Sequence, residues 1–286
     1  MAKFILITDD SCDLPAKYYM DNKVSVVKLG YNIDGETYRA GDKTEKEFYD
    51  LLRAGKMPTT VAVNVEDARA AMEPHLKNGD DVLYIAFSSG LSASANNTAM
   101  AAAELREEYP GRKLIVVDSL CASLGQGLLL HKVIELRNKD VSIEDAAKWA
   151  QDNRLNVAHY VVADDLMHLH RGGRVSKTSA IAGSMLGVKP IIYMDNEGKL
   201  KAIGKVRGKK QALASAVDRI EKCVGKTENN FFTICHADCI EDAEHVAKLM
   251  SVRFGIKDYL INYIGPVIGS HTGVGTIAIF MMAEHR

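Results

Sequence analysis

The 286-residue sequence has almost no net charge, no long apolar run and no secretory signal, three features that would indicate particular classes of protein. Its formal net charge is −1, with 36 Lys and Arg against 37 Asp and Glu, so the overall charge gives no indication of nucleic-acid binding. No apolar run approaches the roughly 20 residues that a membrane helix needs. The short apolar start, residues 1–8, is followed by three aspartates, which is unlike a secretory signal. We therefore expect a cytoplasmic protein without membrane insertion.

Cysteines and nucleotide motifs are also scarce. The five cysteines are an odd number and are scattered, which is not typical of a disulfide framework. The run 235–239 (Cys-His-Ala-Asp-Cys) invites a metal interpretation, but the chain lacks a second ligand pair with zinc-finger spacing. We expect buried thiols and a strand-end turn there, and no metal. Gly225-Lys226-Thr227 resembles the end of a P-loop, yet Ile220 stands where the first glycine is needed. We therefore expect no ATP or NAD site in this chain.

Short apolar runs alternate with helical patterns, and the length allows two modest domains. In residues 1–156 this alternation predicts a Rossmann-like parallel sheet with helices on both faces. The second half begins near residue 157 and contains a hairpin signal at 195–198, which predicts an α/β domain with a mixed sheet. We expect strands at 4–8, 24–29, 31–33, 81–87, 113–117, 157–163, 188–194, 199–206, 231–235, 259–264 and 276–282. We expect helices after Pro15 and at 44–52, 65–76, 91–109, 122–137, 208–223 and 241–254.

The segment 265–276 (Gly-Pro-Val-Ile-Gly-Ser-His-Thr-Gly-Val-Gly-Thr) is the most informative about a ligand site, because it combines four glycines and a proline with one histidine. Glycines permit positive φ and let backbone amides approach a ligand closely. We interpret it as a loop between two strands, with His271 placed to contact an anion. The alternative is a tight turn with a solvated histidine.

Serines and threonines follow two other elements. Residues 88–92 (Ser-Ser-Gly-Leu-Ser) come after a buried strand and open a helix, a position that suits anions because helix N-termini carry unpaired amides. We expect one of these serines to cap the helix and a second to have another role. Pro58-Thr59-Thr60 lies between two expected helices, and a threonine cap is the simplest interpretation.

Two basic clusters stand out against the near-zero net charge. The first is residues 171–177 (Arg-Gly-Gly-Arg-Val-Ser-Lys), and the second comprises Lys205, Arg207, Lys209 and Lys210. Such clusters are often a solvated face. The alternative is a surface that docks an acidic partner or a phosphate.

Taken together and in this order, these segments resemble the DegV family of bacterial fatty-acid-binding proteins. The resemblance extends over nearly the whole chain and includes residues 7–15 (Ile-Thr-Asp-Asp-Ser-Cys-Asp-Leu-Pro), 117–119, 122–127, 189–190 and 265–276. It implies a two-domain DegV-like fold, with one long-chain fatty acid in a buried tunnel between domains 1–156 and 157–286. It also implies a role as the lipid-binding subunit of a two-component fatty acid kinase. A separate ATP-dependent kinase protein would phosphorylate the carboxylate to an acyl phosphate for phospholipid synthesis, and this chain would be neither an enzyme alone nor dependent on a cofactor.

The resemblance also implies roles for particular residues. Carboxylate contacts map to Thr60, Ser92 and His271. Supporting head-group positions are Ser89, Gly90, Ala93, Ser270 and Thr272, and positions at the mouth or the partner-docking face are Arg171, Arg174, Lys205 and Arg207.

Two departures from the family pattern lie close to this site. Residues 61–64 are Val-Ala-Val-Asn where the family usually has Ser-Gln-Pro-Ser, and residues 93–94 are Ala-Ser where Gly-Thr is usual. They keep two alternatives open: a lipid carrier or sensor without a kinase, and a phosphotransferase-like binder of a small polar substrate that uses His271. A serine hydrolase using Ser92 and His271 is disfavoured because the chain has no Gly-x-Ser-x-Gly elbow.

Overall fold

The computed structural model describes residues 4–176 and 187–286. Its first sheet is four-stranded, entirely parallel and ordered β2-β1-β6-β7. The strands are β1 (Ile5–Asp9), β2 (Val24–Val27), β6 (Val82–Ala86) and β7 (Leu114–Asp118). The parallel sheet predicted for the first half is thus confirmed.

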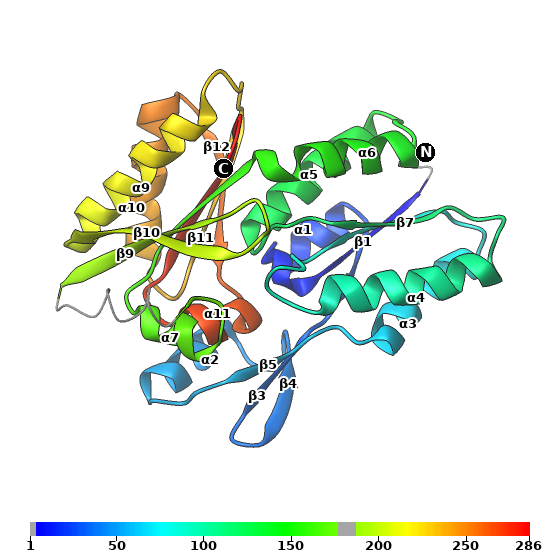
Figure 1. Cartoon of the computed structure of the whole chain (residues 1–286), viewed down its shortest axis with the longest axis horizontal. Helices are drawn as coiled ribbons and strands as arrows, with labels where there is room; N and C mark the ends of the chain where they lie inside the picture. Colours follow the sequence, from blue (N-terminus) through cyan, green and yellow to red (C-terminus); the bar gives the residue numbers. More distant parts are fainter. Residues whose placement is uncertain (1–3, 177–186) are drawn as a thin grey trace.

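Helices cover both faces of this sheet (Figure 1). One face packs against α1 (Ala16–Asp21), α5 (Leu124–Asn138) and α6 (Ile143–Asn153), and the other packs against α3 (Val65–Lys77) and α4 (Ser94–Glu108). The alternation of side chains along a strand explains the two layers, because Leu6 enters the first core and its neighbour Ile7 enters the second. Helix α6 was not predicted from the sequence.

The second sheet has six strands in the order β10-β9-β8-β13-β11-β12. It is mixed, as predicted, because β11 and β12 are parallel whereas the other neighbours are antiparallel. The strands are β8 (Val157–Val162), β9 (Val188–Met194), β10 (Leu200–Arg207), β11 (Phe231–His236), β12 (Asp258–Tyr263) and β13 (Ile277–Met282). The hairpin predicted at 195–198 joins β9 to β10. Helices α9 (Lys209–Val224) and α10 (Ile240–Phe254) cover one face (Figure 1).

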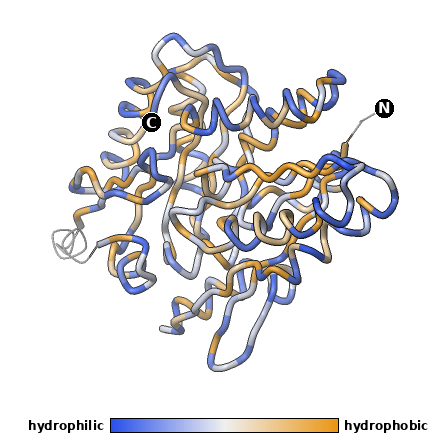
Figure 2. Tube along the Cα trace, turned by 45° about the vertical axis from the view of Figure 1, so that its right-hand side comes forward, coloured by the Kyte–Doolittle hydropathy of each residue, from blue (hydrophilic) through white to orange (hydrophobic). Residues whose placement is uncertain are grey.

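Helix α5 lies between the two sheets. Its buried residues include the polar Gln126 and the three leucines at 128–130. The buried residues of α5 lie on all sides of the helix. The same core cluster contains residues of both sheets and of α5, so this helix joins the two halves. In Figure 2 the inner strands are mostly hydrophobic, whereas the outer helices alternate between hydrophobic and hydrophilic turns. The division into domains at residue 156 stays a prediction.

A third, antiparallel sheet was only partly predicted. It has the order β4-β3-β5, from β3 (Gly30–Ile33), β4 (Glu36–Arg39) and β5 (Thr59–Val61). The turn between β3 and β4 is Asp34-Gly35, with φ values of 54° and 87°, and Asp-Gly is a preferred pair for two-residue hairpin turns. Thr60 lies in β5 and is not a helix cap. Asn64 caps α3 instead, since its side chain accepts a hydrogen bond from Asp67 N.

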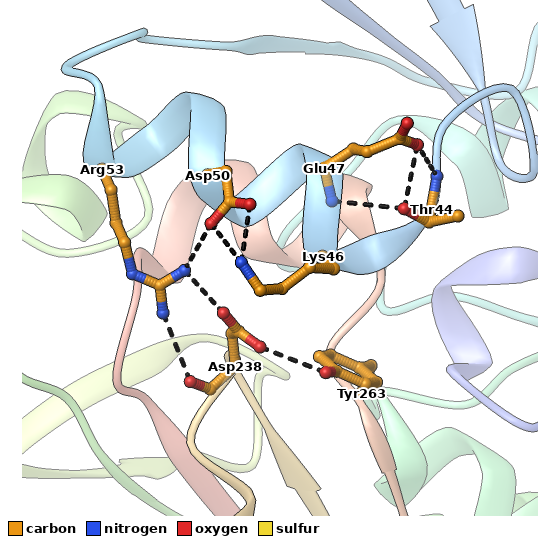
Figure 3. A network of polar contacts seen from close by, with 7 residues as sticks. All are labelled: Thr44, Lys46, Glu47, Asp50, Arg53, Asp238 and Tyr263. Atoms are coloured by element: carbon orange, nitrogen blue, oxygen red, sulfur yellow. Dashed lines mark hydrogen bonds and ion pairs between the residues drawn. The ribbon is translucent and has the colours of Figure 1, made fainter.

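Polar contacts fix α2 (Glu45–Arg53) against the second half of the chain (Figure 3). Arg53 Nη1 lies 2.5 Å from Asp238 Oδ2, and Tyr263 Oη donates to Asp238 Oδ1 at 3.1 Å. The buried Tyr49 hydroxyl donates to Ile264 O at 2.7 Å. The predicted capping box of α2, Thr44 with Glu47, is present. These contacts hold the antiparallel sheet next to the segment that follows β12.

One segment expected to be a loop contains a helix, and another helix that was not predicted precedes the basic run. The run 266–272 forms α11 (Pro266–Thr272), and α7 (Leu166–Arg171) ends at the first arginine of the basic run. Pro266 is favourable at the first turn because its missing N–H would be unpaired there anyway. Gly273, with φ 73°, ends the helix. Lys177 of the basic run lies outside the described residues.

Two short 3-10 helices, Asp10–Cys12 and Arg154–Asn156, complete the described elements. None of the helices described in residues 4–176 and 187–286 is long and apolar enough to span a membrane.

Candidate functional site

A cavity of about 230 Å³ lies where β5, α11 and the loop after β6 meet the inner face of the mixed sheet. Its apolar lining includes side chains from both halves of the chain: Leu29, Val61, Phe87, Leu91, Val161, Leu169, Met194, Leu200, Ile264, Val267, Ile268 and Phe280. Its polar lining is Thr60, Ser92, Ser123, His159, Arg174, His271, Thr272 and Thr276. A mostly apolar cavity with a few converging polar groups is the usual form of a small-molecule site.

Thr60 and His271 are neighbours in the lining of this cavity. Thr60 Oγ1 lies 2.9 Å from His271 Nε2, and these residues come from β5 and α11. Burial, and secondarily the charge of Arg174, lowers the pKa of His271 to about 4, so the ring is neutral at physiological pH. The second ring nitrogen, Nδ1, is buried without a hydrogen-bond partner in the described part of the chain. Gly172 stands against it, since a Cβ added there would lie closer than 3.0 Å to Nδ1.

Ser92 belongs to the loop between β6 and α4. The expectation that a serine of residues 88–92 caps this helix was wrong: α4 begins at Ser94, and its N-cap is Ala93 in αR backbone without a side-chain cap. The chain makes a turn over residues 88–92 before the helix starts. Ser92 Oγ instead accepts a hydrogen bond from Ser94 N at 3.2 Å and lies 2.9 Å from Ser94 Oγ.

The remaining serine and glycine of this loop hold it against the other half. Ser88 Oγ donates to Gly198 O at 2.8 Å. Gly90 lies directly against the same hairpin, because a Cβ there would be within 3.0 Å of Glu197 O and Gly198 O. Ser89 is exposed and contributes only its amide, which donates to Asp118 Oδ1. The loop thus positions Leu91 and Ser92 at the cavity, while Ser88 and Gly90 pack against the β9–β10 hairpin.

The structure brings six of the predicted site residues together in the cavity lining: Thr60, Ser92, Ala93, Arg174, His271 and Thr272. Ser89, Gly90 and Ser270 are not lining residues. Ser270 is buried inside α11, where its hydroxyl donates to Pro266 O at 2.7 Å.

Arg174 is the charged side chain that lines the cavity among the described residues. Its Nε donates to Leu91 O at 3.2 Å, and its Nη1 donates to Gly172 O. Burial lowers the pKa of this guanidinium, but an arginine remains charged under any physiological condition. A positive charge therefore lies at the polar end of the cavity, where it favours an anion.

Of the other predicted basic residues, Arg171, Lys205 and Arg207 are exposed, whereas Lys209 is only partly exposed. Arg171 Nη2 lies 3.8 Å from Asp165 Oδ2, and Lys209 Nζ lies 3.3 Å from Asp164 Oδ1. Because these aspartates are consecutive, the two basic clusters lie near one another. Lys205 and Arg207 occupy exposed positions of β10, the edge strand of the mixed sheet.

The sequence analysis did not assign the lining residues Ser123, His159 and Thr276 to the site, and it missed two residues that support Ser92 and His271. Ser94 is fully buried and contacts Ser92, and Gly172 contacts His271. A serine two residues after Ser92 was visible as a departure from the family pattern, but nothing in the sequence indicated its partner. The other departure also borders the site, since Val61 and Ala62 line the cavity.

A second cavity, of about 690 Å³, lies on the other side of Val267. It is larger, but ionisable side chains contribute much of its wall: Asp10, Asp13, Lys23, Lys28, Glu45 and His75. Its walls therefore suit an apolar ligand less well than those of the first cavity.

The candidate metal run is occupied by internal hydrogen bonds. Cys235 Sγ lies 2.9 Å from Ser123 Oγ, and His236 Nδ1 accepts from Cys239 N at 3.2 Å. Within residues 4–176 and 187–286, no group of three His, Cys, Asp or Glu side chains is arranged to hold a metal ion.

Comparison with known proteins agrees with this architecture. The family described as "Uncharacterised protein, DegV family" matches residues 3–284. A DegV domain-containing protein of Clostridium perfringens is 39% identical over 289 residues, covering 100% of this chain and 99% of the relative. A fatty-acid-binding DegV family protein of Thermus thermophilus is 28% identical, with a TM-score of 0.87 over 98% of this chain and 99% of that one. DegV of Bacillus subtilis, described as a fatty acid binding protein, is also 28% identical, with a TM-score of 0.85 over 99% and 100% of the two chains. The chain therefore belongs to the DegV family.

Proposed function

We propose that this protein binds a long-chain fatty acid, with the acyl chain in the 230 Å³ cavity and the carboxylate at Thr60, Ser92 and His271. The observation that carries the proposal is an apolar cavity whose polar end combines two hydroxyls, a histidine and the charge of Arg174. The fatty-acid-binding relatives from Thermus thermophilus and Bacillus subtilis support the same ligand class.

The energetics of burial agree with such a ligand. A chain of roughly 14 methylenes gains about 11 kcal/mol when it leaves water, at about 0.8 kcal/mol per methylene. Immobilisation of the ligand removes several kcal/mol of this gain. A carboxylate that left water unpaired would cost several more, and the hydroxyls of Thr60 and Ser92 with the Arg174 charge offset that cost. The tail therefore supplies affinity, and the polar end supplies orientation.

We further propose that the bound carboxylate is presented to a separate ATP-dependent kinase, which converts it to an acyl phosphate. The chain has no nucleotide motif of its own, and its exposed arginines, Arg171 and Arg207, suit an acidic partner surface. In this scheme the chain positions the carboxylate and keeps the tail away from water. The alternatives are a carrier or sensor without a kinase, and a binder of a small polar substrate. The apolar lining disfavours the second of these.

The first test is mass spectrometry of the organic extract of the denatured protein, purified from bacteria. A stoichiometric fatty acid is expected. An empty extract, combined with no uptake of added stearate, contradicts the proposal and favours the polar-substrate alternative.

The second test is His271→Ala, with the exposed His285→Ala as its matched control. Loss of a hydrogen bond that supports a charged ligand costs about 1.5–3 kcal/mol, which weakens stearate binding roughly 10- to 100-fold. Acyl phosphate is measured by trapping with hydroxylamine, in the presence of ATP, Mg²⁺ and a bacterial fatty acid kinase. If His271→Ala binds stearate and yields acyl phosphate as the native protein does, the role assigned to His271 is wrong. If the native protein binds stearate but yields no acyl phosphate, the carrier alternative is favoured.

A further inference from the structure

The hydrogen bonds around Ser94 determine which way its proton points. Ser94 is fully buried at the start of α4. Its Oγ accepts a hydrogen bond from Val63 N at 3.1 Å. The hydroxyl proton also needs an acceptor, because an unpaired buried donor is costly. Ser92 Oγ, at 2.9 Å, is the acceptor within reach, so Ser94 donates to Ser92.

Ser92 then has no acceptor capacity left. A hydroxyl oxygen has two lone pairs and one proton. Ser92 Oγ accepts from the Ser94 hydroxyl and from Ser94 N, which lies 3.2 Å away. Its own proton remains, and Ser92 lines the cavity. The Ser92 hydroxyl is therefore a donor toward a ligand and not an acceptor from one.

A related argument orients the proton of Thr60, although Thr60 Oγ1 accepts only one hydrogen bond and keeps a second lone pair. The His271 ring is neutral, and its Nδ1, against which Gly172 stands, finds no hydrogen-bond acceptor within residues 4–176 and 187–286. A proton on Nδ1 would be a buried donor without an acceptor, which is costly. An unprotonated Nδ1 can instead direct its lone pair at the Gly172 Cα–H. The proton therefore resides on Nε2, which donates to Thr60 Oγ1 at 2.9 Å. The Thr60 hydroxyl then directs its own proton toward the cavity.

We propose that Ser94 is a positioning residue that makes the Ser92 hydroxyl, at the polar end of the cavity, a hydrogen-bond donor only, beside the Thr60 hydroxyl that His271 orients. Such a site selects a group that only accepts hydrogen bonds, an ionised carboxylate or the acyl phosphate formed from it. A fatty alcohol brings a proton of its own, which Ser92 cannot accept. This inference rests on the proposed fatty-acid binding, and it adds the origin of the selectivity for the anionic head group.

The test compares stearate with octadecan-1-ol, which have tails of equal length. Affinities are measured by native mass spectrometry and by competition with a fluorescent fatty acid, for the native protein, Ser94→Ala, Ser94→Thr and the control Ser251→Ala in α10. We expect Ser94→Ala to weaken stearate binding about 10-fold, the effect of losing one hydrogen bond. Octadecanol binding should change less than about twofold, because Ser92 can then accept a proton. Ser94→Thr keeps a hydroxyl at this position and should therefore have the native ratio of stearate affinity to octadecanol affinity. Ser251→Ala should not change that ratio.

Several outcomes would overturn the inference. If Ser94→Ala weakens both ligands equally, or if threonine does not restore the ratio, Ser94 has only a structural role. If the native protein binds neither ligand, the proposed function itself is wrong, and this outcome is distinct from a failure confined to Ser94. Should the alanine variant not fold, the same ratio is measured on Ser94→Cys, whose thiol is a weaker donor.

Discussion

Replacement of Gly172 by alanine tests the polar end of the cavity without removing any polar group. Gly172 follows α7 with φ −71° and ψ −6°, a backbone that alanine adopts without strain. Alanine in such a position should even stabilise the protein by about 0.4–1 kcal/mol, because it lowers the entropy of the unfolded chain. Its Cβ, however, would lie closer than 3.0 Å to His271 Nδ1, a separation that real Cβ atoms essentially never show.

The magnitude follows from what must move. The Gly172 backbone is held by its amide, which donates to His168 O at 3.0 Å, so the His271 ring has to shift away from the new methyl group. That shift breaks or lengthens the 2.9 Å hydrogen bond between His271 and Thr60. Overpacking of this kind costs about 1–3 kcal/mol, which exceeds the gain from the unfolded state. We expect a net loss of about 1–2 kcal/mol in the free energy of unfolding and about 10-fold weaker stearate binding.

The assay is urea unfolding together with stearate competition on Gly172→Ala. Gly111→Ala is the matched control, because a Cβ at Gly111 meets nothing within 4 Å. The control should be as stable as the native protein or slightly more stable, with unchanged binding. If Gly172→Ala behaves like this control in both measurements, then His271 is not held by close packing, and the tautomer argument fails with it.

Two further predictions concern buried groups beyond the polar end. Burial, partly offset by a hydrogen bond from Leu29 N, raises the pKa of Asp10 from 3.8 to about 8, so its contribution to stability is complete below pH 3.8 and is lost as the pH rises through about 8. In Asp10→Asn the decline in the free energy of unfolding between about pH 4 and 8 should therefore be shallower, measured by urea unfolding across that range; an unchanged decline would contradict the assignment. Gly125 packs against His159 and Phe280, where a Cβ would lie closer than 3.0 Å to either ring. Gly125→Ala should thus lower the unfolding midpoint by an amount equivalent to about 1–3 kcal/mol, and a midpoint equal to that of Gly111→Ala would refute the close packing.

Much of the fold could be predicted because its signals are local. Apolar runs of five or six residues became the strands of both large sheets. The capping box of Thr44 and Glu47 began a helix where expected, and the Asp195–Gly198 turn closed the β9–β10 hairpin. Each of these features depends on residues within a few positions of one another, so neighbours in the sequence are enough to decide it. The family resemblance then joined these local elements into an expected whole.

The elements that were mispredicted depend on distant contacts. The run 265–276 has the glycine content typical of a loop, but α11 forms because tertiary packing stabilises it. Gly269 lies directly against Tyr49 and Phe48, leaving no room for a Cβ, and the Tyr49 hydroxyl holds Ile264 O just before the helix. Strand β5 likewise exists because β3 pairs with it, since three residues with mixed polarity carry no recognisable strand pattern of their own.

The sequence by itself determined the α/β class, the two large sheets, the family and several of the polar residues that line the cavity. Only the tertiary structure decided how those residues use their protons. Thr60 and His271 are 211 positions apart, and Ser94 contacts Val63 across 31 positions. A hydroxyl becomes a donor or an acceptor according to the groups that surround it, and for this site those groups come from segments that only folding brings together.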